Sequence, residues 1–481
     1  MRCNDMELVG VGLGSLVLFL FAGDWLLPVS IVTLWMCLKL TATGDRLYVL
    51  GLAMTFQWSQ TSLGVFYHGL TGRTVPAIVS SDYRPMVLIG LACVLALSAG
   101  IKLGLMARKP PDPAEPRPDF AFSFGPLIIA YVTGVFVEGT LLAIAPNYPS
   151  LRQIITTLDT ARLGVLFLIM RRLCSPTPRW GTLALVVSVE VVMGMSGFFA
   201  GFREPIVLAF LAVLEVFDRR NTQHWVAVTV AIVGVSVLGL VWMGIRRDYR
   251  REYVEVDRFS DSRSIRVQRV SDLASAFFKN DLEDVLRTAD SLVDRMWTIY
   301  YPALAIARVP SVLPHTNGAI LNDALTHIVT PRVFFPDKPE LMSDSDKVRK
   351  YSNVHVAGRE SNTSIAFGYA AEAYIDFGIP LMFVPVFCFG LFIGAMYALF
   401  RSIIWHRELF VAFGTVAFWL SAYLFERSWA TMLGVTVGFM VYLGSPTVLI
   451  DRFLLVRFAA GKAKEDHELM FDAPLKQDRY S

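Results

Sequence analysis

Long apolar runs are the feature that most constrains the fold of this chain. A helix needs about 20 apolar residues to cross the roughly 30 Å hydrocarbon core of a bilayer. Runs that suit such helices occur at approximately residues 7–22, 24–40, 47–66, 86–106, 124–145, 153–171, 182–202, 204–217, 225–245, 380–400, 409–426 and 431–450. The sequence therefore predicts an all-α polytopic membrane protein with about twelve transmembrane helices.

Composition indicates the same class of protein. Of the 481 residues, 54% are hydrophobic and only 18% are charged, whereas a soluble chain carries about a quarter charged residues. The net charge of +3 is too small to indicate a nucleic-acid partner. The first apolar run has no small-residue cleavage site, so we interpret it as the first span and not as a removed signal peptide.

Lys and Arg residues in the short connections predict the orientation, because cytoplasmic loops carry an excess of these residues. The cationic connections all follow even-numbered spans, at Arg108, Lys109, Arg117, Arg171, Arg172, Arg179, Arg219, Arg220, Arg401, Arg407, Arg452, Arg457, Lys462 and Lys464. Both termini are therefore predicted to be cytoplasmic. The long segment 246–379 follows the ninth span and is predicted to lie outside.

This orientation divides the chain into four parts. An N-terminal transmembrane bundle of about nine spans covers residues 1–245. A large extracytoplasmic loop covers residues 246–379, and three further spans cover residues 380–450. Residues 451–481 form a cytoplasmic tail.

The large outer loop is predicted to be folded and mostly helical. Apolar residues recur at helical spacing over residues 282–296 and again over 320–328, which indicates two amphipathic helices. None of the five cysteines lies in this loop, and no Cys/His cluster has the spacing of metal ligands. We therefore expect no disulfide framework, no metal and no other cofactor.

The first candidate motif lies at the outer end of the seventh span. In GMSGFFAGFREP, Gly194, Gly197 and Gly201 share one helical face and allow another helix to approach closely. Arg203 then emerges at the membrane surface, where an Arg is suited to hold a phosphate at headgroup depth. The alternative is an interfacial anchor that extends to the headgroups.

The second candidate motif is an arginine run that leaves the membrane after the ninth span. On a continuing helix, Arg246 and Arg250 share one face, and Arg247 and Arg251 share another. Clustered guanidinium groups suit a diphosphate, whose charge one cation does not neutralise. The alternative is a solvated or lipid-contacting collar.

The third candidate motif lies late in the outer loop. Arg332 and Lys338 flank an aromatic turn stiffened by prolines, and Glu372 and Asp376 lie four residues apart on a helix that leads into the tenth span. Paired acids beside cations at a membrane mouth can supply a general base or bind sugar hydroxyls. Tyr369 offers a stacking surface for a sugar ring. The alternative is a capped re-entrant helix with surface charges.

Charged residues inside the predicted spans are costly and need partners. Asp159 and Arg162 interrupt the sixth span and are spaced to pair on a helix. Glu190 lies inside the seventh span. It is either a functional group or one member of a satisfied polar contact, and the sequence leaves both roles open.

This layout and three local patterns resemble those of the O-antigen and exopolysaccharide repeat-unit polymerases, often called Wzy-type. The patterns are a Ser/Gly-rich helix end with Arg, from Ser196 through Arg203, a Pro-Arg…Pro-Asp-Lys-Pro segment from Pro331 to Pro339, and a Gly…Glu-Ala-Tyr…Phe-Gly segment from Gly368 to Gly378. The layout covers most of the chain, and the motifs cover a small part of it.

The resemblance implies a metal-independent membrane glycosyltransferase of the GT-C type in the bacterial inner membrane. It would polymerise surface polysaccharide by transferring a glycan from undecaprenyl diphosphate to a sugar hydroxyl of an incoming lipid-linked repeat unit. Its partners would be this carrier, membrane lipid, and a chain-length regulator and flippase of the same pathway. Arg332 and Lys338 would bind the second lipid carrier.

The resemblance also implies catalytic roles at the outer membrane surface. Arg203, with Arg246 or Arg250, would stabilise the charge that develops on the leaving diphosphate. Glu372 would orient or deprotonate the acceptor hydroxyl. Tyr369 and the other loop residues would shape a groove for the glycan and exclude water.

Three alternatives stay open. A ligase that passes finished glycan to another acceptor would use the same donor and the same cations. A transporter or flippase commonly shows internal repeats with broken helices in matching halves. The single asymmetric loop and the surface position of the charges disfavour transport. A non-enzymatic assembly scaffold is the remaining alternative.

Overall fold

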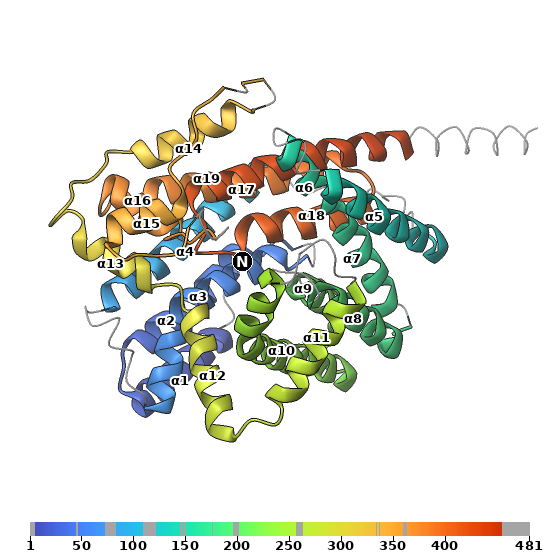
Figure 1. The fold of residues 1–481 in the computed structure, drawn as a ribbon, viewed down its shortest axis with the longest axis horizontal. Coiled ribbons are helices and arrows are strands. Elements are labelled where there is room, and N and C mark those ends of the chain that lie inside the picture. The colour runs from blue at the N-terminus through green and yellow to red at the C-terminus, as the bar shows by residue number, and fades with distance from the viewer. Residues whose placement is uncertain are drawn as a thin grey trace, which may run out of the picture.

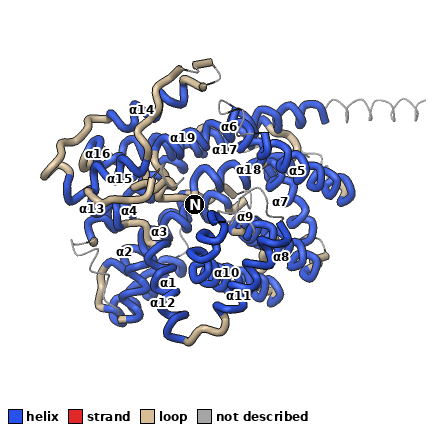
Figure 2. Tube along the Cα trace, viewed as in Figure 1, coloured by secondary structure: helices blue, strands red, loops and turns tan. Residues whose placement is uncertain are grey.

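The fold is made of helices throughout the described part of the chain (Figures 1 and 2). The computed structural model describes residues 5–44, 47–72, 83–108, 122–144, 148, 151–175, 177–195, 202–255, 263–332, 334–335, 337–358 and 363–454. Within these ranges no strand occurs. The predicted all-α class is therefore confirmed.

Each of the twelve apolar runs coincides with one or two helices. These are α1 (Asp5–Ala22), α2 (Leu26–Leu40), α3 (Val49–Thr71), α4 (Arg84–Leu105), α5 (Phe124–Ile144), α6 (Arg152–Asp159), α7 (Ala161–Cys174), α8 (Trp180–Met195), α9 (Arg203–Glu215), α10 (Thr222–Glu255), α17 (Phe383–Ile403), α18 (Arg407–Ala422) and α19 (Trp429–Gly438), which continues as a π-helix (Phe439–Gly444).

Six stretches of the described chain are long and apolar enough to cross a membrane. They are Arg84–Leu105, Phe124–Leu141, Gln153–Cys174, Thr222–Tyr249, Phe383–Ile403 and Trp429–Leu454. The structure therefore has the helices of a multi-span membrane protein. The remaining predicted spans, and with them the count of about twelve, stay a prediction.

The closest helix contact joins α4 to α17 through two GxxxG motifs. A Cβ added to Gly100 would lie 2.1 Å from the carbonyl oxygen of Phe387, and one added to Gly390 would lie 2.2 Å from that of Leu97. One turn further along both helices, a Cβ on Gly394 would lie 2.2 Å from the carbonyl oxygen of Ile101. Glycine is therefore required here, and the contacts advance in the same direction on both helices, so α4 and α17 pack in parallel.

The large loop contains the two amphipathic helices that its sequence predicts. They are α12 (Leu282–Met296) and α14 (Ala319–Val329). The other helices of the loop are α11 (Arg263–Phe277), α13 (Tyr300–Arg308), α15 (Asp344–Ser352) and α16 (Tyr369–Phe377). We call the side of the bundle that carries α13–α16 the loop face (Figure 1).

Trp297 fixes the loop to the bundle directly after α12. Its side chain is 4% exposed, and its ring occupies the space where a Cβ on Gly64 of α3 would stand. The Trp297 indole donates to the carbonyl oxygen of Thr61 at 2.9 Å, and the amide of Thr298 donates to that of Gln60 at 3.0 Å. The chain after α12 is thus held on α3 by both packing and hydrogen bonds.

An ion-pair network joins three helix ends away from the loop face. Glu215, at the end of α9, accepts from Arg171 of α7 at 2.7 Å and from Arg407 of α18 at 2.9 Å. Arg171 also approaches Glu408 to 3.4 Å. Arg171 and Arg407 therefore share one face of the bundle, as the charge pattern predicts. The assignment of that face to the cytoplasm stays a prediction.

A second network lies among the spanning helices. Arg162 of α7 binds Glu138 of α5 at 2.6 Å and Glu190 of α8 at 3.0 Å, and it also donates to the hydroxyl of Tyr131 at 3.2 Å. Arg162 thus links three helices through these partners and does not form the predicted pair with Asp159, because α6 ends at Asp159 and α7 begins at Ala161. Glu190 is one member of this polar contact.

Candidate functional site

Two glutamines of α3 position the chain that connects α18 to α19. The Gln60 side chain donates to the carbonyl oxygen of Tyr423 at 3.0 Å and accepts from the amide of Phe425 at 3.0 Å. Gln57 donates to the carbonyl oxygen of Ala422. Both glutamines are buried. Because a buried amide side chain is costly unless it is hydrogen-bonded, these contacts fix residues 422–425 against α3.

Arg427 emerges from this fixed segment and is itself held in place. Its guanidinium lies 5.2 Å from the centre of the Tyr423 ring and donates to the carbonyl oxygen of Leu420. Tyr423 in turn stacks on Trp419, with ring centres 4.7 Å apart. Stacked aromatic rings beneath a guanidinium give it a fixed direction at little entropic cost.

Arg203 is the first residue of α9 and exerts an electrostatic effect on Arg427. Its side chain is 48% exposed and lies 3.9 Å from the carboxylate of Glu204. Burial is the main cause that lowers the pKa of Arg427, and the positive charge of Arg203 lowers it further. The two guanidinium groups therefore lie within electrostatic reach of one another. We call Arg203 and Arg427 the arginine pair.

A third arginine approaches the arginine pair from the large loop. Arg295 of α12 donates to both carboxylate oxygens of Glu426, at 2.9 and 3.4 Å. This is a bidentate pair, which fixes geometry better than a single contact. The side chains are 55% and 30% exposed, so the pair contributes more to position than to stability. Through it, α12 is tied to the residue before Arg427.

A buried ion pair follows at the start of α19. Lys347 of α15 donates to Glu372 of α16 at 2.7 Å and approaches Asp344 to 3.4 Å. The other oxygen of Glu372 accepts from the amide of Trp429 at 2.7 Å, and the Ser428 hydroxyl donates to Asp344 at 3.0 Å. Acidic groups here suit the positive end of α19. The loop helices are thus built around the start of this helix.

Burial affects both members of this ion pair. It raises the pKa of Glu372, and Lys347 and the Trp429 amide oppose that rise. Burial alone would lower the pKa of Lys347, but Glu372 and Asp344 outweigh it, so that this pKa is raised. Glu372 is only 1% exposed. The structure therefore places the predicted catalytic acid inside the protein, where it holds Lys347 and caps α19.

Two adjoining pockets open above this ion pair. The smaller has a volume of about 180 Å³ and lies between α14 and α15, and the larger has a volume of about 470 Å³. They share the side chains of Leu341, Met342 and Ala430. The larger is further lined by polar side chains, namely His327, Arg332, Glu340, Ser343, Asp344, Thr363, Ser364 and Thr431. We call the two together the loop pockets.

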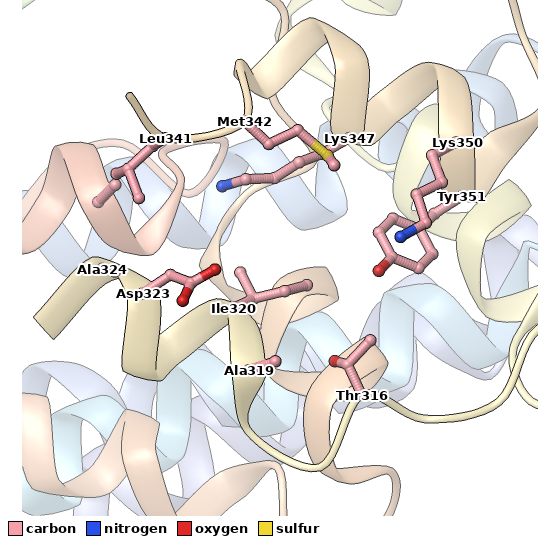
Figure 3. Close-up of a pocket in the computed structure, with 11 residues that line it drawn as sticks. Thr316, Ala319, Ile320, Asp323, Ala324, Leu341, Met342, Lys347, Lys350 and Tyr351 are labelled. Carbon is pink, nitrogen blue, oxygen red and sulfur yellow. The ribbon is translucent and has the colours of Figure 1, made fainter. Parts of the chain in front are cut away.

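The smaller pocket combines charged, hydroxyl and apolar walls (Figure 3). Asp323 of α14 and Lys347 of α15 line it from facing helices, and the apolar side chain of Ile320 lies beside Asp323. Tyr351 and Thr316 supply hydroxyl groups. A carboxylate and hydroxyls beside an apolar surface suit a small polyhydroxylated ligand.

Two other predicted substrate-binding residues are buried in supporting roles. Asp376 is 0% exposed and accepts from the amides of Ile320 at 3.0 Å and Leu321 at 2.8 Å, and from the Thr316 hydroxyl. It thereby caps the start of α14. Tyr369 is also 0% exposed, with its hydroxyl 2.7 Å from Gln57. Its ring is therefore enclosed by protein and not open to a sugar.

One of the two predicted cations of the late loop lies at the larger pocket. Arg332 lines it, whereas Lys338 donates to the carbonyl oxygens of His327 and Thr330, both at 2.7 Å, at the end of α14. Burial lowers the pKa of His327, and Lys338 and Arg332 lower it further. His327 and Arg332 therefore line one pocket together, and Lys338 lies next to them, bound to the carbonyl oxygen of His327.

The remaining predicted residues lie apart from the loop pockets. Arg246 is half-buried on α10, and Arg250 follows one turn later on the same helix. The Ser196–Gly201 part of the first motif lies outside the described residues. Segment 426–431 joins the arginine pair to the loop pockets, because Arg427 belongs to the pair while Ala430 and Thr431 line the pockets.

Sequence reasoning missed Arg427, Lys347 and Asp323. The sequence did contain a feature that indicates Arg427, because Glu426 and Arg427 stand where the last two predicted spans are connected on the predicted outer side. No sequence feature indicates Lys347 or Asp323, because they come together only where α14 and α15 face each other across the smaller pocket. Among the described residues, no three His, Cys, Asp or Glu side chains gather as metal ligands.

Comparison with known proteins places this chain in one family. Residues 125–403 match the family described as Domain of unknown function (DUF8712), and the match covers more than half of the chain. The chain belongs to this family. No curated protein and no solved structure matches it. The matched region includes Arg203, the large loop and all of α17, and it ends before Arg427.

Proposed function

We propose that this protein is a membrane glycosyltransferase that elongates lipid-linked oligosaccharides. It transfers a glycan from undecaprenyl diphosphate to a sugar hydroxyl of a lipid-linked repeat unit. The observation that carries this proposal is Arg427, which is held against Tyr423 and Leu420 at the start of the segment whose Ala430 and Thr431 line the loop pockets. A lipid diphosphate and a glycan need this combination of a cationic membrane boundary beside a polar pocket.

The arginine pair supports the role of a diphosphate site. Guanidinium groups bind phosphate oxygens in bidentate fashion. As the bond between the sugar carbon and the diphosphate oxygen breaks, negative charge develops on that oxygen. Arg203 and Arg427 would stabilise this charge, and fixed cations do so without reorganising during the reaction.

The loop pockets support the role of an acceptor site. The acceptor hydroxyl must lose its proton as its oxygen bonds to the transferred sugar carbon. Glu372 is buried beneath the pocket floor, whereas Asp323 is exposed and reaches into the smaller pocket (Figure 3). We therefore assign proton acceptance to Asp323. Glu372 would position Lys347 at the opposite wall.

Reconstituted protein with lipid-linked repeat units tests this function. Wild type should convert single units into a ladder of longer chains. Arg203→Ala and Arg427→Ala should each slow this conversion by roughly 10²- to 10³-fold, since one stabilising donor is lost. Arg287→Ala is the matched control, because Arg287 is 70% exposed and pairs with Glu283 on the outer side of α12.

The products also separate the alternative functions. Transfer of a finished chain to a different acceptor, with no ladder, would identify a ligase. Movement of the lipid-linked unit across the membrane with no new glycosidic bond would identify a flippase. Ladders of unchanged length and rate from both arginine variants would refute the proposed diphosphate site.

A further inference from the structure

The turn between α11 and α12 carries an exposed apolar patch. Phe278, Leu282 and Leu286 are 68%, 73% and 42% exposed. They gather where one short helix ends and the next begins, at the edge of the helix bundle in Figure 1. Large exposed apolar side chains that cluster in this way mark an interaction surface.

The packing of α11 and α12 places this patch at the depth of a membrane span. A Cβ on Gly244 of α10 would lie 2.4 Å from the ring of Phe277, and one on Gly239 would lie 3.7 Å from Leu292 of α12. Both glycines fall inside Thr222–Tyr249, a stretch that is long and apolar enough to cross a membrane. Gly244, whose contact Phe277 adjoins the patch, lies five residues before Tyr249, which is about 7.5 Å along a helix.

The charged residues of α12 next to the patch, Glu283 and Arg287, lie about 100° around the helix from Leu282 and Leu286. Glu283 and Arg287 are 78% and 70% exposed and form an ion pair at 2.6 Å. The exposed leucines and the exposed charges thus occupy two neighbouring strips along α12. An amphipathic helix with this division lies in the membrane interface, with its apolar side in the acyl boundary.

We propose that the α11–α12 turn inserts Phe278, Leu282 and Leu286 into the lipid of the membrane that the bundle spans. The occupant of this surface is the acyl-chain boundary of the bilayer. The argument rests on the contact with a spanning helix and does not depend on the proposed enzymatic function. The far end of α12 carries Arg295, which binds Glu426 beside the arginine pair. One end of α12 therefore lies in lipid and the other lies at the candidate site.

Spin labels on the full chain test this insertion. Cys3 and the exposed Cys388 are first replaced by Ser, and nitroxides are attached to Phe278→Cys and Leu282→Cys variants in phosphatidylethanolamine–phosphatidylglycerol vesicles. Collisions with oxygen, which partitions into lipid, should exceed collisions with a water-soluble nickel chelate. The ratio of the two should be several-fold higher than in the controls Glu283→Cys and Arg287→Cys.

Two results would overturn the insertion. A ratio at 278 and 282 equal to that of the controls would place the turn in water. Exclusion of both reagents at 278 and 282 would show that protein, such as a second copy, covers the patch. The unsubstituted chain gives a second test, with a photoreactive group on the acyl chains. Cross-linked peptides should include residues 278–286, and cross-links confined to the spanning helices would contradict the proposal.

Discussion

At the scale of single residues, two carboxylates of one short helix fix the starts of two other helices. Glu372 accepts from the first amide of α19, and Asp376, one turn later, accepts from two amides at the start of α14. Buried charges persist only when they are paired or hydrogen-bonded. Both acids meet this condition, so their spacing serves the architecture of the loop pockets and not direct contact with a ligand.

Glu372 should therefore matter first for stability. Glu372→Gln leaves the ammonium of Lys347 without its closest partner, and breaking a buried ion pair costs about 3–5 kcal/mol. Removing both charges, in Glu372→Gln with Lys347→Met, should recover much of this loss. Thermal unfolding of the purified protein in detergent measures both variants. Equal destabilisation in the single and double variants would show that the pair itself is not the cause.

Asp323 should show the opposite behaviour. It is exposed on α14, so Asp323→Asn should leave the unfolding temperature close to that of the wild type. In the reconstituted assay the same change should slow transfer by about 10²- to 10⁴-fold, as expected for loss of a general base. Asp346→Asn on the exposed side of α15 is the matched control. A full transfer rate in Asp323→Asn would exclude this residue as the proton acceptor.

At the scale of elements, the α4–α17 contact holds the N-terminal bundle to the helix that follows the large loop. Backbones approach closely only where side chains are small, and because lipid supplies no hydrophobic force that brings helices together, close packing of this kind holds them. The four glycines of the two GxxxG motifs make that approach possible. The start of α17 follows α16, so the contact also sets the position of the loop pockets relative to the bundle.

A single methyl group should disturb this contact. Gly390→Ala forces a Cβ to within 2.2 Å of the carbonyl oxygen of Leu97, and overpacking of this kind costs about 1–3 kcal/mol. Gly234→Ala in α10 meets no atom within 4 Å and should be neutral or slightly stabilising. Thermal unfolding in the same detergent compares the two. Indistinguishable curves would argue against a close α4–α17 contact.

The elements were largely predictable from sequence, whereas their partners were not. Periodicity located α12 and α14, and apolar runs located the helices of the bundle, because both signals are local. The contact of Arg162 with Glu138 and Glu190 depends on three helices meeting. Glu372 and Asp376 were correctly placed on one helix, but their burial depends on α14, α15 and α19 covering α16. The sequence pattern therefore predicts which helix carries these acidic residues, but it does not determine whether their side chains are exposed or buried.

At the scale of the whole molecule, charged contacts separate the two ends of the bundle. Arg203 lies at one end of α9, where its charge acts on Arg427, and Glu215 lies at the other end with Arg171 and Arg407. The charge pattern of the short connections predicts that the Glu215 end faces the cytoplasm. The loop pockets would then open outside.

Labelling of intact cells tests this orientation. In a background that lacks Cys3 and Cys388, Glu283→Cys should react with a membrane-impermeant maleimide from outside. Arg219→Cys, in the short connection between α9 and α10, should react only after the cells are permeabilised. Both positions are exposed, so a position that does not react is shielded from the reagent by the membrane and not by burial in the protein. The reverse pattern would invert the predicted topology.

The α4–α17 contact has a consequence for the order of assembly. Gly100 and Gly390 are separated by nearly three hundred positions in the chain, so α4 enters the bilayer long before its partner has been synthesised. Until α17 arrives, the glycine face of α4 must be covered by lipid or by another protein. A chain that stops before α17 would present that face permanently. A membrane quality-control protein that binds the exposed glycine face of α4 would thus distinguish an incomplete chain from a complete one.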